Sequence, residues 1–168
     1  MQEECYNYLY KQIIKYKFAL RYFRPEKKAT GSQKRRMDMK QIYLNTGGEN
    51  KGHYVPGIVS NNMLYISGQL SLDLDTGKVA DGGIREHMRQ ALHNVDRVLQ
   101  AAGRTREDVA FCRVYITGME NWDAANEVYR EFFGAHKNAR IIVSVQELHF
   151  GCMAEIEAIA EMKGGEEA

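Results

Sequence analysis

Two short runs near the end of the chain alternate polar and apolar side chains, and this alternation constrains the fold more than any other feature. The first run covers residues 138–145 and the second covers residues 153–160. Successive side chains of a strand point to opposite faces, so Arg140 and Ile142 share one face of the first strand. In the second strand, Glu155 stands opposite an apolar surface suited to a packed helix. The polar face of that strand must therefore meet water, a partner subunit or a ligand.

Arg140 and Glu155 are the two side chains of these runs with useful chemistry. A guanidinium donates through a planar fork that matches a carboxylate, and a nearby glutamate can handle a proton or orient a water. The same two side chains could instead form an ion pair at the surface or at an interface, because structural pairs outnumber active sites. Spacing alone leaves both interpretations open.

The hydrophobic pattern of the preceding residues predicts four more strands and two amphipathic helices. The strands are expected at residues 41–44, 58–60, 64–70 and 109–117, and the helices at residues 84–102 and 122–133. The order strand, helix, strand, helix, strand predicts two right-handed crossover connections, which place both helices on one face of a sheet. The other face carries Val, Ile and Tyr side chains that are too apolar for water, so we expect oligomerisation to bury it.

Composition and charge exclude several classes of function. The 168 residues suit one compact domain, and no apolar run approaches the ~18 residues that a membrane span needs. Residues 40–168 carry 13 Lys and Arg against 18 Asp and Glu, which argues against a nucleic-acid-binding surface. Cys5, Cys112 and Cys152 are too few and too scattered for a disulfide framework, and the histidines show no metal-ligand spacing. We therefore expect a cytoplasmic protein without a metal site.

Residues 1–39 differ in composition from the rest of the chain. They carry ten Lys and Arg against four Asp and Glu, and they mix aromatic side chains with lysines. We expect a basic extension that is poorly ordered or foreign to the natural protein, followed by a single domain over residues 40–168. A basic amphipathic segment of this kind could also bind a membrane surface or act as a mitochondrial transit peptide.

Five sequence elements follow one another in an order that is specific to one protein family. They are Gly52-His53-Tyr54, Leu64-Tyr65-Ile66-Ser67-Gly68-Gln69, Asn126–Phe133, Ala139-Arg140 and Glu155–Ala160. Through these elements, residues 40–163 resemble the reactive intermediate deaminase family, also called the Rid or YjgF family. The resemblance implies a chorismate-mutase-like (YjgF-like) α+β fold, in which two helices pack on one face of a mixed β-sheet. It also implies assembly as a homotrimer with three clefts between neighbouring subunits.

The resemblance also implies an activity and the residues that perform it. Family members hydrolyse enamine and imine intermediates released by pyridoxal-phosphate-dependent dehydratases, such as 2-iminobutanoate and 2-iminopropanoate, to 2-oxo acids and ammonia. The arginine matching Arg140 binds the substrate carboxylate, and the glutamate matching Glu155 positions the attacking water. The expected substrate-binding residues are Tyr54, Gly68, Asn126 and Ile142, the last through its backbone. Since an imine carbon is already electrophilic, the reaction needs no metal or cofactor.

Structural roles are the alternative for three of these residues. Tyr54 could plug a loop against the core, Asn126 could fix the loop before Arg140, and Gly68 could allow close approach of another strand. The chain also departs from the family pattern in segment 52–57, at Asn138 in place of a proline, and at His149-Phe150 in place of Pro-Lys. We interpret these departures as signs of a divergent subgroup with its own substrate preference.

Two rival functions stay open beside the deaminase. The first is a regulator that uses the same cleft to bind 2-oxo acids or amino acids without turnover. The second is an endoribonuclease, an activity attributed to relatives, although the acidic domain and the lack of paired catalytic histidines argue against it.

Overall fold

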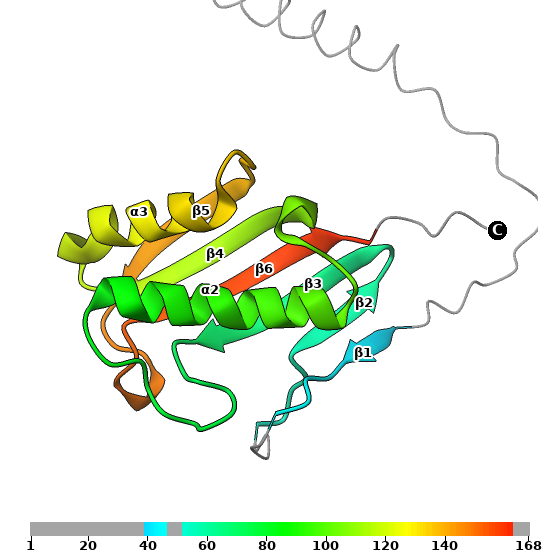
Figure 1. Ribbon diagram of the computed structural model, residues 1–168, viewed down its shortest axis with the longest axis horizontal. Coiled ribbons are helices and arrows are strands. Elements are labelled where there is room, and N and C mark those ends of the chain that lie inside the picture. The colour runs from blue at the N-terminus through cyan, green and yellow to red at the C-terminus, as the bar shows by residue number, and fades with distance from the viewer. Residues whose placement is uncertain (1–38, 47–51, 163–168) are drawn as a thin grey trace, which may run out of the picture. The chain divides into compact units, whose positions relative to one another are not determined.

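The computed structural model describes residues 39–46 and 52–162 (Figure 1). The expected basic extension, residues 1–39, lies outside these residues except for Met39. In chain order the strands and helices are β1 (Lys40–Ile42), β2 (Gly57–Ser60), β3 (Met63–Leu70), α2 (Ile84–Ala101), β4 (Val109–Thr117), α3 (Trp122–Phe133), β5 (Ala139–Val145) and β6 (Ala154–Glu161). Three short 3-10 turns precede β4, α3 and β6, at Arg106–Asp108, Met119–Asn121 and His149–Gly151. Both predicted helices and all six predicted strands are present.

The eight elements form a mixed sheet with both helices on one face, as predicted (Figure 1). The strand order is β1-β2-β3-β6-β4-β5, in which only β4 and β5 pair in parallel. β6 is antiparallel to both of its neighbours, so β3 and β4 run in the same direction on either side of it. Among the described strands, the last in chain order, β6, therefore lies in the interior of the sheet and joins its two halves.

The first strand is shorter than predicted. β1 ends at Ile42 rather than at residue 44 because its partner β2 begins at Gly57, directly opposite Ile42. The residues after Ile42 have no residue of β2 opposite them, so the hydrogen-bonded pairing stops there. β2 and β3 join through the predicted turn at Asn61 and Asn62, which have positive φ angles of 51° and 57°. Two consecutive left-handed residues form the hairpin turn whose twist matches that of the flanking strands.

The core lies between the helices and the sheet. One side of α2 is buried along its length, and Met88, Val95 and Leu99 are each 0% exposed. This side packs against β6, where Ile156 and Ala160 are also fully buried. The helical spacing of three and four thus meets the alternation of the strand, which is the arrangement that the sequence predicts. None of the described helices is long and apolar enough to span a bilayer.

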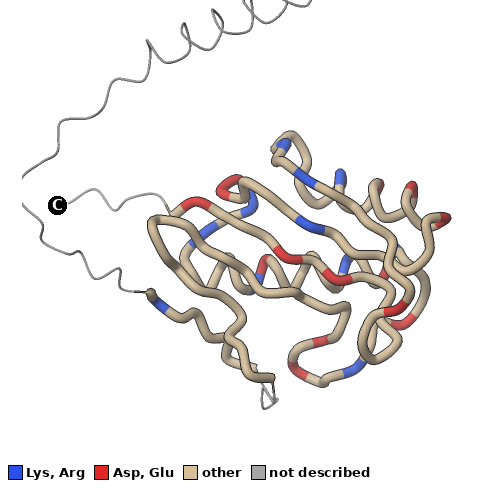
Figure 2. The backbone as a smooth tube through the Cα atoms, turned by 180° about the vertical axis from the view of Figure 1, so that it is seen from behind, with Lys and Arg blue, Asp and Glu red and all other residues tan. Residues whose placement is uncertain are grey.

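The helix-free face of the sheet carries both apolar and charged residues, and Figure 2 marks the positions of Lys, Arg, Asp and Glu along the backbone seen from behind. Tyr65 and Ile141 are each 46% exposed there, on β3 and β5. Between them, Glu157 of β6 accepts hydrogen bonds from Arg113 Nη1 at 3.0 Å and from Tyr115 Oη at 2.8 Å, both on β4. Glu157 therefore has two structural partners on this face.

Candidate active site

Arg140 lies on the helix side of the edge strand β5. Its register partner on β4 is Cys112, which is fully buried beneath the helices, and aligned residues of paired strands share a face. The guanidinium donates from Nη1 to Oδ1 of Asn126 at 2.9 Å. It also lies 4.6 Å from the ring centroid of Tyr129 and 6.0 Å from that of Trp122. Arg140 is thus held by one amide oxygen and by aromatic faces.

Helix α3 supplies all three of these partners from one side. Trp122, Asn126 and Tyr129 follow one another at intervals of four and three residues, which places them on one stripe of a helix. The hydroxyl of Tyr129 donates to Oδ1 of Asn138 at 2.6 Å, just before β5 begins. Sequence reasoning treated Trp122 and Tyr129 only as markers of the helix. Their spacing of four and three residues from Asn126 places them on the same side of the helix. That spacing could have predicted that they contact Arg140 as well.

The charge of Arg140 is not neutralised within the part of the chain that the structure describes. Five other arginines form ion pairs there, namely Arg85, Arg89, Arg97, Arg106 and Arg113. No carboxylate of the described residues lies within 4.0 Å of the Arg140 guanidinium, and its Nε and Nη2 make no hydrogen bond to them. A partly buried guanidinium with an unused pair of donors is suited to bind an anion such as a carboxylate.

Glu155 lies on the helix-free face, at the centre of the sheet. Its register partners are Tyr115 on β4 and Leu70 on β3. Burial raises the pKa of the Glu155 carboxyl above its ordinary value, and the nearby charge of Glu157 raises it further. A raised pKa makes this carboxylate a stronger base than an exposed glutamate, which favours a role in accepting a proton from water.

Gly68 makes room for the Glu155 carboxylate. It lies in an irregular stretch of β3, where the register with β6 shifts between Ile66 and Gln69. A Cβ atom added at Gly68 would collide with Oε1 of Glu155. The close approach expected at this glycine is therefore made by the side chain of Glu155 from the neighbouring strand.

Arg140 and Glu155 do not meet within one chain. Arg140 aligns with Cys112 on the helix side, whereas Glu155 aligns with Tyr115 on the opposite side of the sheet. The ion pair between them that the sequence left open does not form within one chain. Any site that uses both side chains on one ligand needs a second copy to supply one of them.

The other expected binding residues lie in different surroundings. Tyr54 is 57% exposed in the segment before β2, so it does not plug a loop against the core. Asn126 fixes the guanidinium of Arg140 itself rather than the preceding loop. Ile142 is partly buried and packs against the core. Its strand β5 is at the edge of the sheet, and an edge strand leaves backbone groups open to a ligand or a partner chain.

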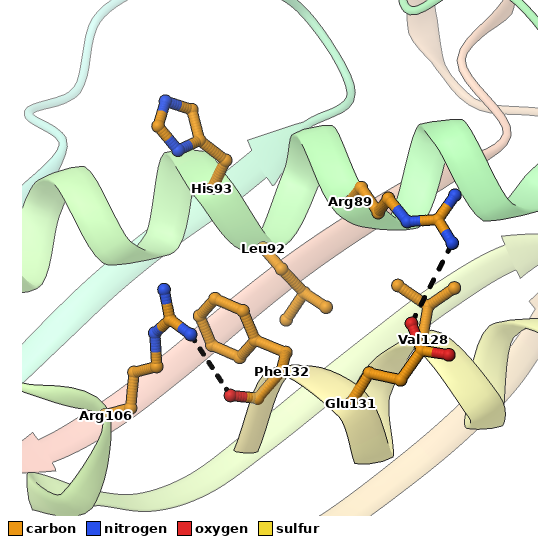
Figure 3. A pocket seen from close by; sticks show the side chains of 7 residues that line it. All are labelled: Arg89, Leu92, His93, Arg106, Val128, Glu131 and Phe132. Carbon is orange, nitrogen blue, oxygen red and sulfur yellow. Dashed lines mark hydrogen bonds and ion pairs between the residues drawn. The ribbon is translucent and has the colours of Figure 1, made fainter. Parts of the chain in front are cut away.

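A pocket of about 310 Å³ lies elsewhere, between α2 and α3 (Figure 3). It is lined by Arg89, Leu92, His93, Arg106, Val128, Glu131 and Phe132, none of which belongs to the predicted site. Its arginines are already paired: Arg106 binds Asp96 through two hydrogen bonds, and Arg89 contacts Glu86 and Glu131. Paired cations have little affinity left for a ligand, so we do not assign the active site to this pocket. Among the described residues, no group of three or more His, Cys, Asp or Glu side chains is arranged to hold a metal ion.

The sequence is similar to those of several known proteins. A family model described as Endoribonuclease L-PSP matches residues 48–162. A RutC family protein from Pyrococcus horikoshii is 41% identical over 109 residues, which cover 65% of this chain and 86% of that protein. A protein from Homo sapiens named 2-iminobutanoate/2-iminopropanoate deaminase is 33% identical over 109 residues, covering 65% of this chain and 80% of its own length.

Solved structures show the same fold. The crystal structure of E. coli TdcF with bound serine has a TM-score of 0.67 and 32% identity, and covers 73% of this chain and 98% of that one. The crystal structure of yeast Mmf1 has a TM-score of 0.70 and 28% identity, with coverage of 75% and 100%. The family match spans more than half of the residues and includes every strand and helix after β1. The chain therefore belongs to the Endoribonuclease L-PSP family, which is also known as the YjgF or Rid family.

Proposed function

We propose that this protein hydrolyses 2-imino acids, such as 2-iminobutanoate and 2-iminopropanoate, to 2-oxo acids and ammonia. The observation that carries the proposal is the unneutralised guanidinium of Arg140, which presents Nε and Nη2 without a partner among the described residues. A 2-imino acid has a carboxylate next to the reacting carbon, so binding it at Arg140 would fix the position of that carbon. The name of the human relative supports this choice of substrate.

The reaction asks little of the protein beyond positioning. Glu155 takes a proton from a bound water as the water oxygen adds to the imine carbon, and the imine nitrogen takes a proton from solvent. Glu155 then returns its proton to the amine of the tetrahedral adduct, which leaves as ammonia while the hydroxyl proton passes to solvent and the carbonyl of the 2-oxo acid forms. The raised pKa of Glu155 suits it to accept the first proton and to return it to the leaving nitrogen.

The proposed site lies between copies of the chain. Arg140 and Glu155 face opposite sides of one sheet, so one copy would supply the arginine and its neighbour the glutamate. We propose a homotrimer, in which each of the three interfaces holds one such site and covers the exposed Tyr65 and Ile141. The cytoplasmic location stays a prediction from the cysteine content.

Three variants test the proposal. A charge-assisted hydrogen bond is worth about 1.5–3 kcal/mol, so Arg140→Lys should lower kcat/KM at least ~10-fold, and Arg140→Ala should lower it more. Glu155→Gln keeps the shape but removes the proton acceptor, so it should lower kcat more than it weakens binding of 2-oxobutanoate. Activity is measured as 2-oxo acid and ammonia formed when the protein is added to a dehydratase reaction.

The same measurements separate catalysis from a structural role. Melting temperature and oligomeric state are recorded for each variant. If the two residues only stabilise an interface, the variants should lose stability or assembly while activity per folded oligomer persists. An Arg140→Ala protein with unchanged turnover would refute the proposal.

A regulator that binds metabolites without turnover is the second candidate. E. coli TdcF was crystallised with bound serine, which is an amino acid with the kind of carboxylate that Arg140 would anchor. The two candidates differ in one respect, because the regulator binds 2-oxo acids or amino acids but does not accelerate imine hydrolysis. Saturable binding of 2-oxobutanoate with no gain in the rate of ammonia release would favour the regulator.

A further inference from the structure

We propose that Tyr129, held in place by Asn138, is a positioning residue that orients the Arg140 guanidinium for a carboxylate ligand. This inference rests on the proposed role of Arg140 as the carboxylate anchor. It concerns side chains that the sequence analysis did not assign to the site. It predicts that the preference for an acid over a neutral analogue depends on an aromatic ring that does not itself touch the ligand.

The first step of the argument is the orientation of the guanidinium. A single hydrogen bond, from Nη1 to Asn126, fixes one atom of a planar group but leaves the plane free to turn about that atom. The ring of Tyr129, with its centroid 4.6 Å from the guanidinium carbon, supplies a second restraint. A cation is attracted to the face of an aromatic ring, and the ring excludes water from that side. The two contacts together leave Nε and Nη2 as the donors for a ligand.

The second step is that the ring is itself fixed at its far end. The Tyr129 hydroxyl donates to Oδ1 of Asn138 at 2.6 Å, and Asn138 lies two residues before Arg140 in the chain. The amide of Asn138 also contacts Sγ of Cys112 at 3.9 Å, and Cys112 is the register partner of Arg140 on β4. The helix that carries the ring is therefore tied to both strands beside the guanidinium.

The third step is that the Tyr129 hydroxyl is a fixed donor rather than an acid. Burial raises the pKa of Tyr129 far above its ordinary value, so the hydroxyl keeps its proton at any working pH. Cys112 beside it also keeps its proton, because burial raises the pKa of its thiol to about 11. Neither group brings a negative charge to the guanidinium, which stays available for an anionic ligand.

Phe133 offers a matched control for the effect of removing a buried ring. It lies on the same helix, is 7% exposed where Tyr129 is 6% exposed, and packs against Tyr129 with ring centroids 4.6 Å apart. Among the described residues, the rings in cation–π contact with Arg140 are those of Trp122 and Tyr129, not that of Phe133. A change at Phe133 thus removes a comparable amount of core packing while keeping both rings that contact the guanidinium.

The experiment measures binding of 2-oxobutanoate and of its neutral amide, 2-oxobutanamide, by calorimetry on the full chain. We expect Tyr129→Leu to weaken binding of the acid roughly 2- to 30-fold, the range of a cation–π contact, while binding of the amide changes little. The ratio of the two affinities should fall accordingly. Phe133→Leu should lower the melting temperature and leave this ratio as in the wild type.

Two milder variants test the tie between Tyr129 and Asn138. Tyr129→Phe and Asn138→Ala each remove the hydrogen bond but keep the ring in the core. Each should lower the acid-to-amide ratio by a smaller factor, and the double variant should lower it no further than Asn138→Ala alone, since Asn138→Ala already breaks the bond that Tyr129→Phe removes. These variants also decide the question if Tyr129→Leu does not fold.

An acid-to-amide ratio that stays at the wild-type value in Tyr129→Leu, or in both milder variants, would overturn the inference. Equal affinity of the wild type for acid and amide would overturn both the anchor and its positioning. The inference can also stand when the proposed reaction fails. In that case the wild type prefers the acid and the ratio falls in Tyr129→Leu, yet no imine is hydrolysed.

Discussion

The surroundings of each arginine decide what its charge can do. The guanidinium of Arg106 donates hydrogen bonds to Asp96 and to the carbonyl of Phe132, so it links α2 to the end of α3. Arg140 has an amide and two aromatic rings in place of a carboxylate. Residue type therefore does not separate a structural arginine from a ligand-binding one, but the charge of its partners does.

Gly68 gives the sharpest prediction for a single residue. Gly68→Ala places a methyl group where Oε1 of Glu155 lies, so the carboxylate must move away from its position. We expect kcat for imine hydrolysis to fall at least ~10-fold, because general acid–base catalysis contributes about 10²–10⁴-fold and depends on geometry. Gly83→Ala is the control, since Gly83 has an ordinary φ of −103° and only a distant neighbour. Equal activity of Gly68→Ala and wild type would show that the position of Glu155 is unimportant.

We expect His87 to make the stability of the protein depend on pH. It is 4% exposed, and its Nδ1 accepts hydrogen bonds from the Ser71 hydroxyl at 2.6 Å and from the backbone N–H of Met153 at 3.1 Å. Burial lowers the pKa of His87, so the unfolded chain takes up a proton more readily than the folded one. The stabilisation is complete above the unfolded pKa of about 6.5 and decreases as the pH falls through that value towards the folded pKa.

Urea unfolding measured between pH 7.5 and pH 5 tests this dependence. The free energy of unfolding should decrease with falling pH, and His87→Gln should reduce the slope. His93→Gln is the control, because His93 is an exposed residue of the same helix. Identical slopes in the wild type and His87→Gln would contradict the role of His87.

Most elements of the fold can be predicted from local pattern. The helices at 84–101 and 122–133 follow from their apolar spacing, and the strand at 109–117 follows from its β-branched residues. The position of β6 between β3 and β4 does not follow, because pairing between residues far apart in sequence leaves no local signal. For the same reason, the alternation predicts which residues share a face within β5 and within β6. It does not predict which face of β5 lies on the same side of the sheet as a given face of β6. Only the register shows that Arg140 and Glu155 lie on opposite sides.

The hairpin between β2 and β3 gives a prediction at the scale of an element. Asn62 has a φ of 57°, which glycine adopts freely and β-branched residues strongly resist. Asn62→Gly should keep or raise the melting temperature, whereas Asn62→Val should cost about 1–2 kcal/mol of stability. Thermal unfolding of the two variants, compared with Asn61→Gly, checks the order. A Val variant as stable as the Gly variant would mean that the turn relaxes to another conformation.

The two faces of the sheet give a prediction for the whole molecule. If each site takes Arg140 from one copy and Glu155 from another, two inactive variants can restore activity when mixed. A site is complete when Glu155→Gln supplies the arginine and Arg140→Ala supplies the glutamate. Random assembly of equal amounts should complete about a quarter of the sites.

This complementation is measured by refolding or coexpressing the two variants together and assaying imine hydrolysis. Each variant refolded alone is the control and should stay inactive. Recovery near a quarter of wild-type activity, in a species of trimer mass by light scattering, is the expected result. No recovery in verified mixed oligomers would place the complete site within one chain or remove one of the two residues from it.

The position of β6 also has a consequence for how the protein is made. β3 and β4 leave the ribosome well before β6, yet no ladder joins them until β6 is present. Until then the sheet exists as two separate halves, one with β1, β2 and β3 and the other with β4 and β5. The edges of β3 and β4 that β6 will pair with stay unpaired, which slows folding and exposes the nascent chain to misassembly. Glu155 lies on that same strand. Completion of the sheet and acquisition of the proposed catalytic carboxylate thus occur in one step.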